Sequence, residues 1–423
     1  MSKIKKIFSS VTDNAYVFSV IAKIISVGTG LLYSVLYSRY MQPELRGTAG
    51  VISNNAELIM LVLCFGVYQG YPYFKKKTGQ DIYNDYINLI SGMFLVYCLT
   101  GGLIILVMRP EPGTIMTIAL IPFMFATKQF NYAVLIEHPK LRNSAQIWID
   151  IFDIVLVVGL MIFTESSFNI CMIFLMAKEV VYFSVAVANL KVNVFKIRPS
   201  LKGLLPYVKF GIVPMITVIM MEINYKADVL MLKGFGVDEA QIGIYTLGVS
   251  LVQKVWLIPD ALKDILLSNL AKGKNEEEVC KITRLSLFIM MFFVVGLIAL
   301  GKPVVNWMYG DSYDGTFTIM LILIVGVVGM VFYKMIYSYN VINGHKNVNL
   351  LLLGIAALTN VAVNALVIPD MGINGAGLAS TISYVVCGIA FLVYFCVKTG
   401  TKFRDMLFVK KSDLAQLKKI FKK

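Results

Sequence analysis

The stretch NVAVNALVIPDMGINGAGLASTISY, residues 360–384, decides the fold of this chain. It joins two apolar runs, 348–368 and 376–398, and each run is long enough to cross a bilayer as a helix. Pro369 is expected to end the first helix, because proline cannot continue one. Gly372 and Gly375 permit a tight turn and a close approach of helices. The stretch therefore predicts two membrane-spanning helices joined by a short turn.

The rest of the chain repeats this apolar pattern. Of its 423 residues, 58% are hydrophobic and 15% are charged, and the mean hydropathy is +0.74. Soluble domains carry roughly a quarter charged residues, so this composition excludes a soluble enzyme. Twelve spans are predicted, near 16–37, 49–73, 84–108, 114–137, 144–164, 168–190, 206–232, 241–268, 284–302, 316–339, 348–368 and 376–398. We therefore expect an all-α polytopic membrane protein with about 12 transmembrane helices.

The basic residues lie mainly between the apolar runs, so the net charge of +14 indicates membrane orientation and not a nucleic-acid partner. With the N-terminus placed in the cytoplasm, 27 Lys and Arg residues fall on the inner side and five on the outer side. Positive connections stay in the cytoplasm. This asymmetry predicts that both termini are cytoplasmic.

A long basic connection, from Lys191 to Lys209, divides the chain into halves. We expect an N-terminal six-helix bundle at 1–190, a cytoplasmic linker at 191–205, a C-terminal six-helix bundle at 206–398 and a basic tail at 399–423. Residues 39–47 and 233–243 resemble one another and follow the first span of each half. A parallel repeat about an axis along the membrane normal is typical of transporters with a site between the halves.

The tail from Phe403 to Lys423 has a helical pattern of apolar residues with lysines around the other faces. Its apolar positions are Phe403, Leu407, Leu414, Leu417 and Phe421. The spacing predicts an amphipathic helix on the inner leaflet, attracted to anionic lipid. A solvated tail that only contributes to the charge asymmetry fits equally well.

Residues 360–384 match the pattern N-x3-N-x2-[LIV]-[LIV]-P-x2-G-x2-G-A-[AG] at every anchor, from Asn360 and Asn364 onward. In this respect the chain resembles the polysaccharide (O-antigen or Wzx-type) flippases of the MATE-like multidrug/oligosaccharidyl-lipid/polysaccharide exporter superfamily. Two further segments are similar to that family, at 228–259 and at 38–47, so the resemblance covers essentially the whole chain. We interpret the two asparagines and the glycines as packing groups and not as direct substrate contacts.

The resemblance implies two six-helix bundles in a MATE-like V, related by a pseudo-twofold axis along the membrane normal. It implies a flippase that moves a polyprenyl-pyrophosphate-linked oligosaccharide, a polysaccharide repeat unit, from the inner to the outer leaflet by alternating access. The implied location is a bacterial or archaeal plasma membrane. The implied partners are the lipid-linked glycan, membrane lipids, a coupling ion (H⁺ or Na⁺) and glycan polymerase or chain-length machinery. A sugar and a pyrophosphate cannot cross hydrocarbon unaided, which is why such a carrier needs a polar cleft.

Ionisable residues within spans cost about 2.5 to 3.5 kcal/mol on insertion scales, so they are expected to face a cavity or a partner. The candidate substrate-binding residues are Lys23, Lys128, Lys226, Lys254 and Lys334. A lysine ammonium can engage a phosphate without demanding one geometry. Lys128 and Lys254 look unpaired at mid-span, whereas Lys178 lies beside Glu179 and is assigned to structure. Ion pairing or snorkelling is the alternative for every one of them, because acidic residues in the spans are numerous.

Glu222 and Asp228 are the candidate ion-coupling residues, since a desolvated carboxylate can exchange a proton or hold sodium. A structural hydrogen-bonding role for Asp228 is equally compatible with the sequence. No metal set, cofactor motif or catalytic constellation stands out, so we do not expect an enzyme. A MATE-type cation or drug antiporter and a lipid II flippase are the nearest alternatives, and a membrane glycan polymerase or ligase is a remote one.

Overall fold

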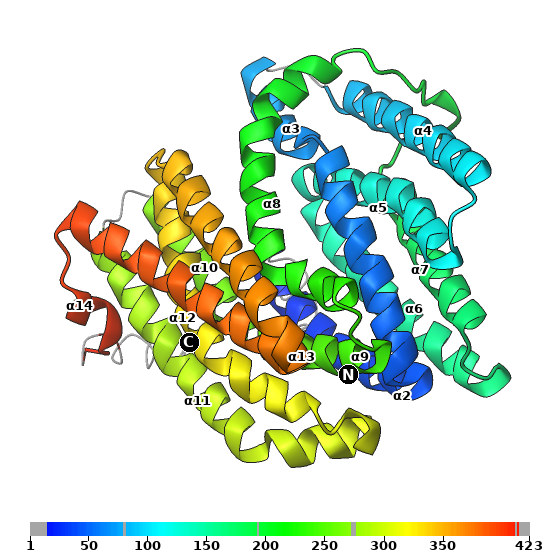
Figure 1. Cartoon of the computed structure of the whole chain (residues 1–423). Helices are drawn as coiled ribbons and strands as arrows, with labels where there is room; N and C mark the ends of the chain where they lie inside the picture. Colours follow the sequence, from blue (N-terminus) through cyan, green and yellow to red (C-terminus); the bar gives the residue numbers. More distant parts are fainter. Residues whose placement is uncertain (1–14, 79–81, 193, 272–275, 411–412, 414–423) are drawn as a thin grey trace, which may run out of the picture. The chain divides into compact units, whose positions relative to one another are not determined.

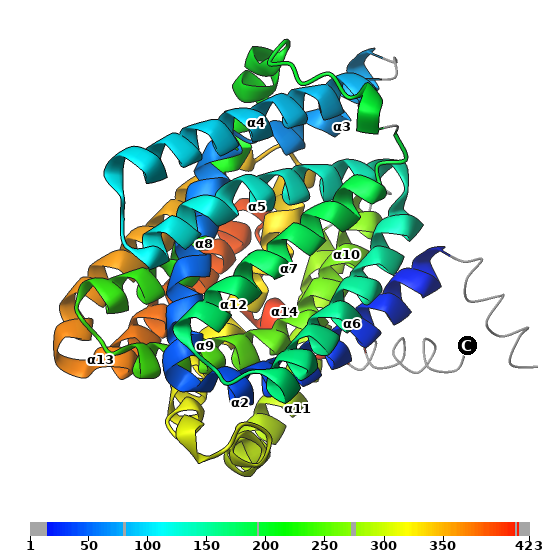
Figure 2. The ribbon, with the colours of Figure 1, turned by 90° about the vertical axis from the view of Figure 1, so that its right-hand side faces the viewer.

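The computed structural model describes residues 15–78, 82–192, 194–271, 276–410 and 413, although a few helical side chains, including those at 15–24, lie outside that description. These described residues form helices and connections without any strand (Figures 1 and 2). The chain folds into two compact units, Met1–Met215 and Ile216–Lys423.

The first unit contains six helices and the beginning of a seventh. They are α2 (Ala15–Leu63), α3 (Val67–Thr78), α4 (Tyr83–Met108), α5 (Pro112–Glu137), α6 (Pro139–Phe163), α7 (Phe168–Ala188), the 3₁₀ turn η1 (Val194–Lys196) and the start of α8 (Leu204–Gly234). The predicted linker at 191–205 lies within this unit, because the division falls later, inside α8. The predicted domain boundaries at 190 and 206 stay a prediction.

The second unit continues from the remainder of α8. It contains α9 (Glu239–Gln253), η2 (Lys254–Trp256), α10 (Leu257–Ala271), α11 (Glu276–Tyr309), η3 (Asp311–Tyr313), α12 (Thr316–Ile342), α13 (Lys346–Thr399) and α14 (Phe403–Leu407). Helix α12 runs through its middle and packs on α9, α10, α11 and α13. Its most apolar window is 72% buried, against 17% for that of α4 in the first unit. Exposed apolar helices such as α4 are therefore the ones suited to face lipid.

Two helices each contain two membrane crossings. α2 has 49 residues and α13 has 54, more than twice the roughly 20 that one crossing needs. α2 is broken at Gln42 (φ 59°, ψ 170°) and α13 at Gly372 (φ 53°, ψ −130°). Pro43 explains the first break, because proline pushes the preceding residue out of the helical region.

Ten of the described segments qualify as spans by length and apolarity, counting the bent pair α2 and α3 as one. Division of α2 and α13 at their breaks raises this number to twelve. The predicted all-α polytopic membrane fold with about twelve transmembrane helices is thus confirmed.

Two local predictions are wrong. The first half of α13 does not end at Pro369 but continues to the break at Gly372, because proline removes one hydrogen bond whereas glycine can adopt the positive φ of the turn. The predicted tail helix is not continuous, because α14 ends at Leu407, Phe408 is extended (φ −98°, ψ 124°) and Asp413 is helical again. Met406 is fully buried there, and α14 packs on α11. The expected apolar positions at 414, 417 and 421 lie outside the described residues.

Candidate functional site

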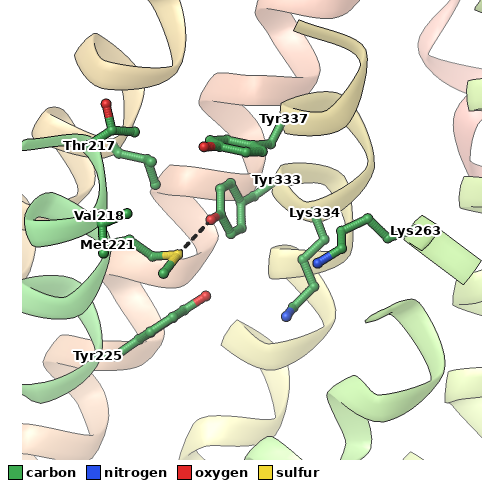
Figure 3. A pocket seen from close by; sticks show the side chains of 9 residues that line it. Thr217, Val218, Met221, Tyr225, Lys263, Tyr333, Lys334 and Tyr337 are labelled. Atoms are coloured by element: carbon green, nitrogen blue, oxygen red, sulfur yellow. Dashed lines mark hydrogen bonds between the residues drawn. The ribbon is translucent and has the colours of Figure 1, made fainter. Parts of the chain in front are cut away.

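A cavity of about 310 Å³ lies within the second unit (Figure 3). Helices α8, α10 and α12 supply its polar and aromatic lining, namely Thr217, Tyr225, Lys263, Tyr333, Lys334 and Tyr337, and Met221 lies among them. The two lysine side chains extend toward the same space from different helices. The cavity therefore combines cations with aromatic rings inside a membrane-spanning bundle.

Lys263 and Lys334 share one carboxylate. The Nζ atom of Lys334 lies 2.8 Å from Oδ1 of Asp260, and the Nζ atom of Lys263 lies 3.5 Å from the same oxygen. The Lys334 side chain is 11% exposed and that of Lys263 is 35% exposed. Two cations beside one anion leave this group with a net positive charge, which an anionic ligand can neutralise.

The break between α9 and α10 places Trp256 against this group. Pro259 has no N–H to bond the carbonyl of Val255, and the chain forms the 3₁₀ turn η2 just before it. The indole N–H of Trp256 donates to the carbonyl of Val327 at 3.1 Å. Its ring centroid lies 4.7 Å from Nζ of Lys334. The indole therefore stabilises the Lys334 ammonium through a cation–π contact in addition to the ion pair.

Tyrosines form the opposite part of the lining. The Tyr333 hydroxyl donates to Sδ of Met221 at 2.9 Å (Figure 3). The rings of Tyr333 and Tyr337 meet edge to face, with centroids 5.7 Å apart. Tyr225 packs on Trp256 at 5.2 Å between centroids. Rigid aromatic faces with hydroxyl groups can contact both the apolar and the polar surfaces of a ligand.

The structure gives the other predicted lysines of the second unit different surroundings. Lys226 pairs with Glu222 one helical turn away, with Nζ and Oε2 3.3 Å apart. Lys254 begins η2 and is partly buried, and it interacts with neighbouring groups. The prediction that Lys254 is unpaired is therefore wrong. Of the three predicted lysines in the second unit, Lys226, Lys254 and Lys334, only Lys334 lines the described cavity.

Lys128 of the first unit lies on α5, partly buried, with Nζ 5.5 Å from the ring centroid of Tyr68. Among the described residues it has no carboxylate partner within ion-pair distance. Tyr68 stands in the first turn of α3, directly after the break between α2 and α3, where Phe65 and Gly66 have positive φ values. The N-terminal end of α3 carries a partial positive charge that adds to that of Lys128. The side chain of Lys23, on α2, lies outside the described residues.

Asp228 is buried in a polar cluster of the second unit. Its carboxylate accepts hydrogen bonds from Tyr245, from Ser380 at 3.0 Å and from its neighbour's main-chain N–H at 2.8 Å. Asn360 reaches Ser380 at 3.5 Å, and Asn364 donates to Asn360 at 3.0 Å. The side-chain oxygen of Asn364 is buried without a hydrogen-bond partner in the described structure.

Glu222 does not belong to this cluster, because its partner is Lys226. The two predicted ion-coupling carboxylates thus have different environments, and only Asp228 is surrounded by buried hydroxyl and amide groups. Within the described residues, no group of three or more His, Cys, Asp or Glu side chains is arranged to hold a metal ion.

Comparison with known proteins defines the family. The family described as polysaccharide biosynthesis protein matches residues 85–318, more than half of the chain. The chain belongs to this family.

Among solved structures, this polysaccharide biosynthesis protein is similar to lipid II flippase MurJ in an inward closed conformation (TM-score 0.76, 16% identity, 96% of this chain and 92% of that one covered). It is also similar to an inward-facing multidrug resistance MATE family transporter of the MOP superfamily (TM-score 0.64, 12% identity, 90% and 98% covered). A third similar structure is a MOP superfamily transporter from Pyrococcus furiosus (TM-score 0.56, 15% identity, 91% and 95% covered). No curated protein sequence matches. These likenesses show a shared fold, and the family and fold together indicate a membrane flippase or transporter.

Two features of this polysaccharide biosynthesis protein did not emerge from its sequence. Lys263 lines the cavity although it was not a candidate, and the tyrosines at 333 and 337, one turn apart, were the signal that α12 faces a polar space. In the first unit, Lys178 pairs with Asp153 at 3.6 Å and not with the adjacent Glu179. Its assignment to structure agrees with that ion pair.

Proposed function

We propose that this protein is a flippase that moves a polyprenyl-pyrophosphate-linked oligosaccharide from the cytoplasmic to the outer leaflet by alternating access. The observation that carries the proposal is the cavity in which Lys263 and Lys334 share Asp260 beside three tyrosines. The polysaccharide biosynthesis family and the flippase and transporter folds of similar structures support it.

The chemistry of the cavity suits this cargo. A pyrophosphate carries negative charge and accepts hydrogen bonds, so it can compete with Asp260 for the two ammonium groups. The tyrosine rings offer apolar faces to sugar rings, and their hydroxyls can bond to sugar hydroxyls. Lysine binds phosphate as a flexible point charge, which favours release after binding.

The depth of the cavity fits loading from the cytoplasm. Lys263 and Lys334 each lie eight residues before the ends of α10 and α12, which is about 12 Å along a helix. Both helix ends are expected on the cytoplasmic side, where positive connections gather. A headgroup arriving from the inner leaflet would meet the two ammonium groups within the first third of the bilayer.

In the first unit, considered by itself, Lys128 is a separate candidate contact for an anionic group. It is held over Tyr68 and lies beside a broken span, an arrangement in which helix termini face transported ligands in other carriers. An ammonium without a carboxylate within ion-pair distance needs no partner to be displaced before an anion binds.

Asp228 is the proposed coupling site. It contributes a carboxylate to a cluster that also contains the oxygens of Ser380, Asn360 and Asn364. Oxygen-only ligand sets bind hard cations, and the unpartnered oxygen of Asn364 is a free acceptor for one. A proton on Asp228 is the alternative coupling ion.

The positive charge of the cavity argues against a MATE-type antiporter of cationic drugs, which would need an acidic site. A lipid II flippase would use the same chemistry, because lipid II also links a glycan to a polyprenyl pyrophosphate. The two are distinguished by which lipid-linked glycan accumulates on the inner leaflet when the protein is removed.

Charge rescue tests the role of the cavity. Lys334→Gln should abolish export of surface glycan and accumulate its lipid-linked precursor, because it leaves Lys263 neutralised by Asp260. The double variant Lys334→Gln/Asp260→Asn restores one uncompensated cation and should recover part of the export. Lys302→Gln is the control for loss of one charge, because Lys302 is an exposed lysine near the C-terminal end of α11, outside the cavity lining.

Membrane abundance is measured for each variant, so that misfolding is not read as lost transport. Normal export in Lys334→Gln and in Lys263→Gln would reject the site. An inactive double variant with normal abundance would show that export requires the Asp260 carboxylate. The net charge of the cavity would then not explain the loss of export in Lys334→Gln.

A further inference from the structure

The connection between α7 and α8 is fastened across the first turns of α4, within the first unit (Figures 1 and 2). The main-chain N–H of Arg198 donates to the side-chain oxygen of Asn88 at 2.8 Å. The N–H of Ser200 donates to the main-chain oxygen of Asn88 at 3.0 Å. At Gly92 a Cβ atom would lie 2.8 Å from the Ser200 main chain, so only glycine permits this approach. One asparagine and one glycine thus hold the connection in place.

A cavity of about 470 Å³ lies between this connection and α4. Its polar lining consists of Asn84 and Asn88 from α4 and Lys191 and Lys196 from the connection. The neighbouring carboxylate, Asp85, is not part of the lining. Two ammonium groups and two amides therefore face a single space, in which no lining residue carries negative charge.

The backbone conformation of Lys191 is unusual. This residue adopts the left-handed conformation (φ 53°) just after α7. The hydroxyl of Tyr83 donates to the carbonyl of Leu190 at 2.9 Å, which ties the preceding residue to the start of α4. A non-glycine residue in this conformation is held there by its surroundings. The fold therefore fixes the backbone of Lys191, and its exposed side chain starts from a defined point at the edge of the cavity.

The cavity lies where two spans end, which is where lipid headgroups are expected. It is bounded by the first turn of α4 and the residues that follow α7, and both helices are membrane spans. Phe195, between the two parts of the connection that line it, is 99% exposed. Leu201 and Leu205, which follow, are 48% and 62% exposed. Apolar side chains beside lysines at the end of a span are typical of a segment lying at the membrane interface.

We propose that this cavity is a binding site for the phosphate-bearing headgroup of an anionic phospholipid. Lys191 and Lys196 bind the phosphate, Asn84 and Asn88 donate to its oxygens or to headgroup hydroxyls, and Phe195 lies among the acyl chains. The bound lipid is a resident of the inner-face interface and not the transported cargo. The proposal is independent of the flippase function, because it involves none of the residues of the cavity in the second unit.

A lipid fits these observations better than a soluble anion. Basic pockets between membrane helices on the cytoplasmic side bind anionic headgroups, and each basic residue strengthens the attraction. A free phosphate would gain nothing from Phe195, whereas a lipid gains apolar contact from it.

Lipid binding to the purified, delipidated protein tests the proposal, with native mass spectrometry during titration of phosphatidylglycerol or of phosphatidylcholine with the same acyl chains. The wild type should prefer phosphatidylglycerol. Lys191→Gln/Lys196→Gln should weaken its binding by about tenfold or more. The matched control, Arg198→Gln/Lys202→Gln, removes the same charge from the same connection outside the cavity and should change binding by only about twofold.

Two further measurements keep the test decisive. Phe195→Ser should weaken phosphatidylglycerol binding, while inorganic phosphate should not displace the lipid. If the double lysine variant does not fold, the exposed single variant Lys196→Gln should still lose about threefold or more. Equal losses in the cavity and control pairs, unchanged binding in the cavity variants, or displacement by inorganic phosphate would each overturn the proposal.

Discussion

Arg284 and Asp413 form a buried bidentate ion pair that fastens the C-terminal segment to α11. Nε of Arg284 lies 2.7 Å from Oδ2 of Asp413, and Nη2 lies 3.0 Å from Oδ1. The two side chains are 6% and 3% exposed. A third guanidinium nitrogen donates to the main-chain oxygen of Asp405, within α14. One arginine therefore holds the chain at two points after the last span.

Replacement of Asp413 by Asn should release this segment. Breaking a buried pair from one side costs about 3–5 kcal/mol, because the remaining charge loses its partner. We expect faster amide hydrogen exchange across 403–407 in Asp413→Asn at neutral pH. Asp405→Asn is the control, since its ion pair with Lys410 is exposed and the main-chain bond to Arg284 remains. Equal protection in Asp413→Asn and the wild type would contradict this role.

The same pair predicts a response to acid. Burial raises the pKa of Asp413, but hydrogen bonds from Arg284 and from the N–H of Lys410 outweigh it, so that the pKa lies below its ordinary value. A lowered pKa means that the stabilisation is complete above the unfolded value of about 4 and is lost as the pH falls through the folded value. Protection factors for 403–407 should therefore persist to pH 4 and fall below it. Asp413→Asn should show no such step.

Helices α12 and α13 cross where two glycines meet. A Cβ atom on Gly388 would lie 2.2 Å from the main-chain oxygen of Gly329. Gly388→Ala should therefore destabilise the second unit by about 1–3 kcal/mol, lowering the midpoint of thermal unfolding in detergent. Gly354→Ala, also on α13 but with open space around it, should be neutral or stabilising because alanine favours helix. The idea fails if the two variants melt alike.

Lys128 and Lys178 should differ in what their loss does. Among the described residues, Lys128 has no carboxylate within ion-pair distance, so Lys128→Ala leaves no buried anion without its partner. Export should therefore fall while membrane abundance stays normal. Lys178→Ala removes the ion-pair partner of the buried Asp153, so the membrane abundance itself should fall. Quantitative immunoblots and surface-glycan assays separate the two outcomes. Normal export in Lys128→Ala would remove this lysine from the proposed substrate path.

Asp228→Asn should uncouple transport from its ion. The amide keeps the size of the side chain and the ability to accept from Tyr245, but it removes the charge that a cation or proton needs. The rate of transport in proteoliposomes should lose its dependence on a sodium or proton gradient. Glu222→Gln is the matched control, because Glu222 is paired with Lys226. Retained gradient dependence in Asp228→Asn would exclude the assignment.

Most of the fold follows from local sequence. Apolar runs bounded by charge predict the helices, and Pro43 and Gly372 mark the breaks in α2 and α13 because proline and glycine act on the backbone directly. The break at η2 was not predicted, since Pro259 is compatible with the first turn of an ordinary helix.

The sites depend on contacts that a sequence pattern does not contain. Lys334 pairs with a carboxylate 74 positions away, and Asp228 bonds Ser380, 152 positions away. A lysine within a predicted span indicates that its ammonium group has a partner or a ligand. Which carboxylate it meets depends on how α10 and α12 are rotated about their axes, and that is decided by tertiary packing.

The single-residue breaks at Gln42 and Gly372 have a practical consequence for mapping topology. Where one span turns into the next without a loop, few residues are accessible to a membrane-impermeant thiol reagent. An epitope inserted there would also disrupt the turn. The wider connections at 109–111, 164–167, 235–238 and 310–315 are the places for single-cysteine reporters of the face that the charge asymmetry predicts to be extracellular. The native cysteines at 64, 171, 280 and 387 are buried, so background labelling from them should be low.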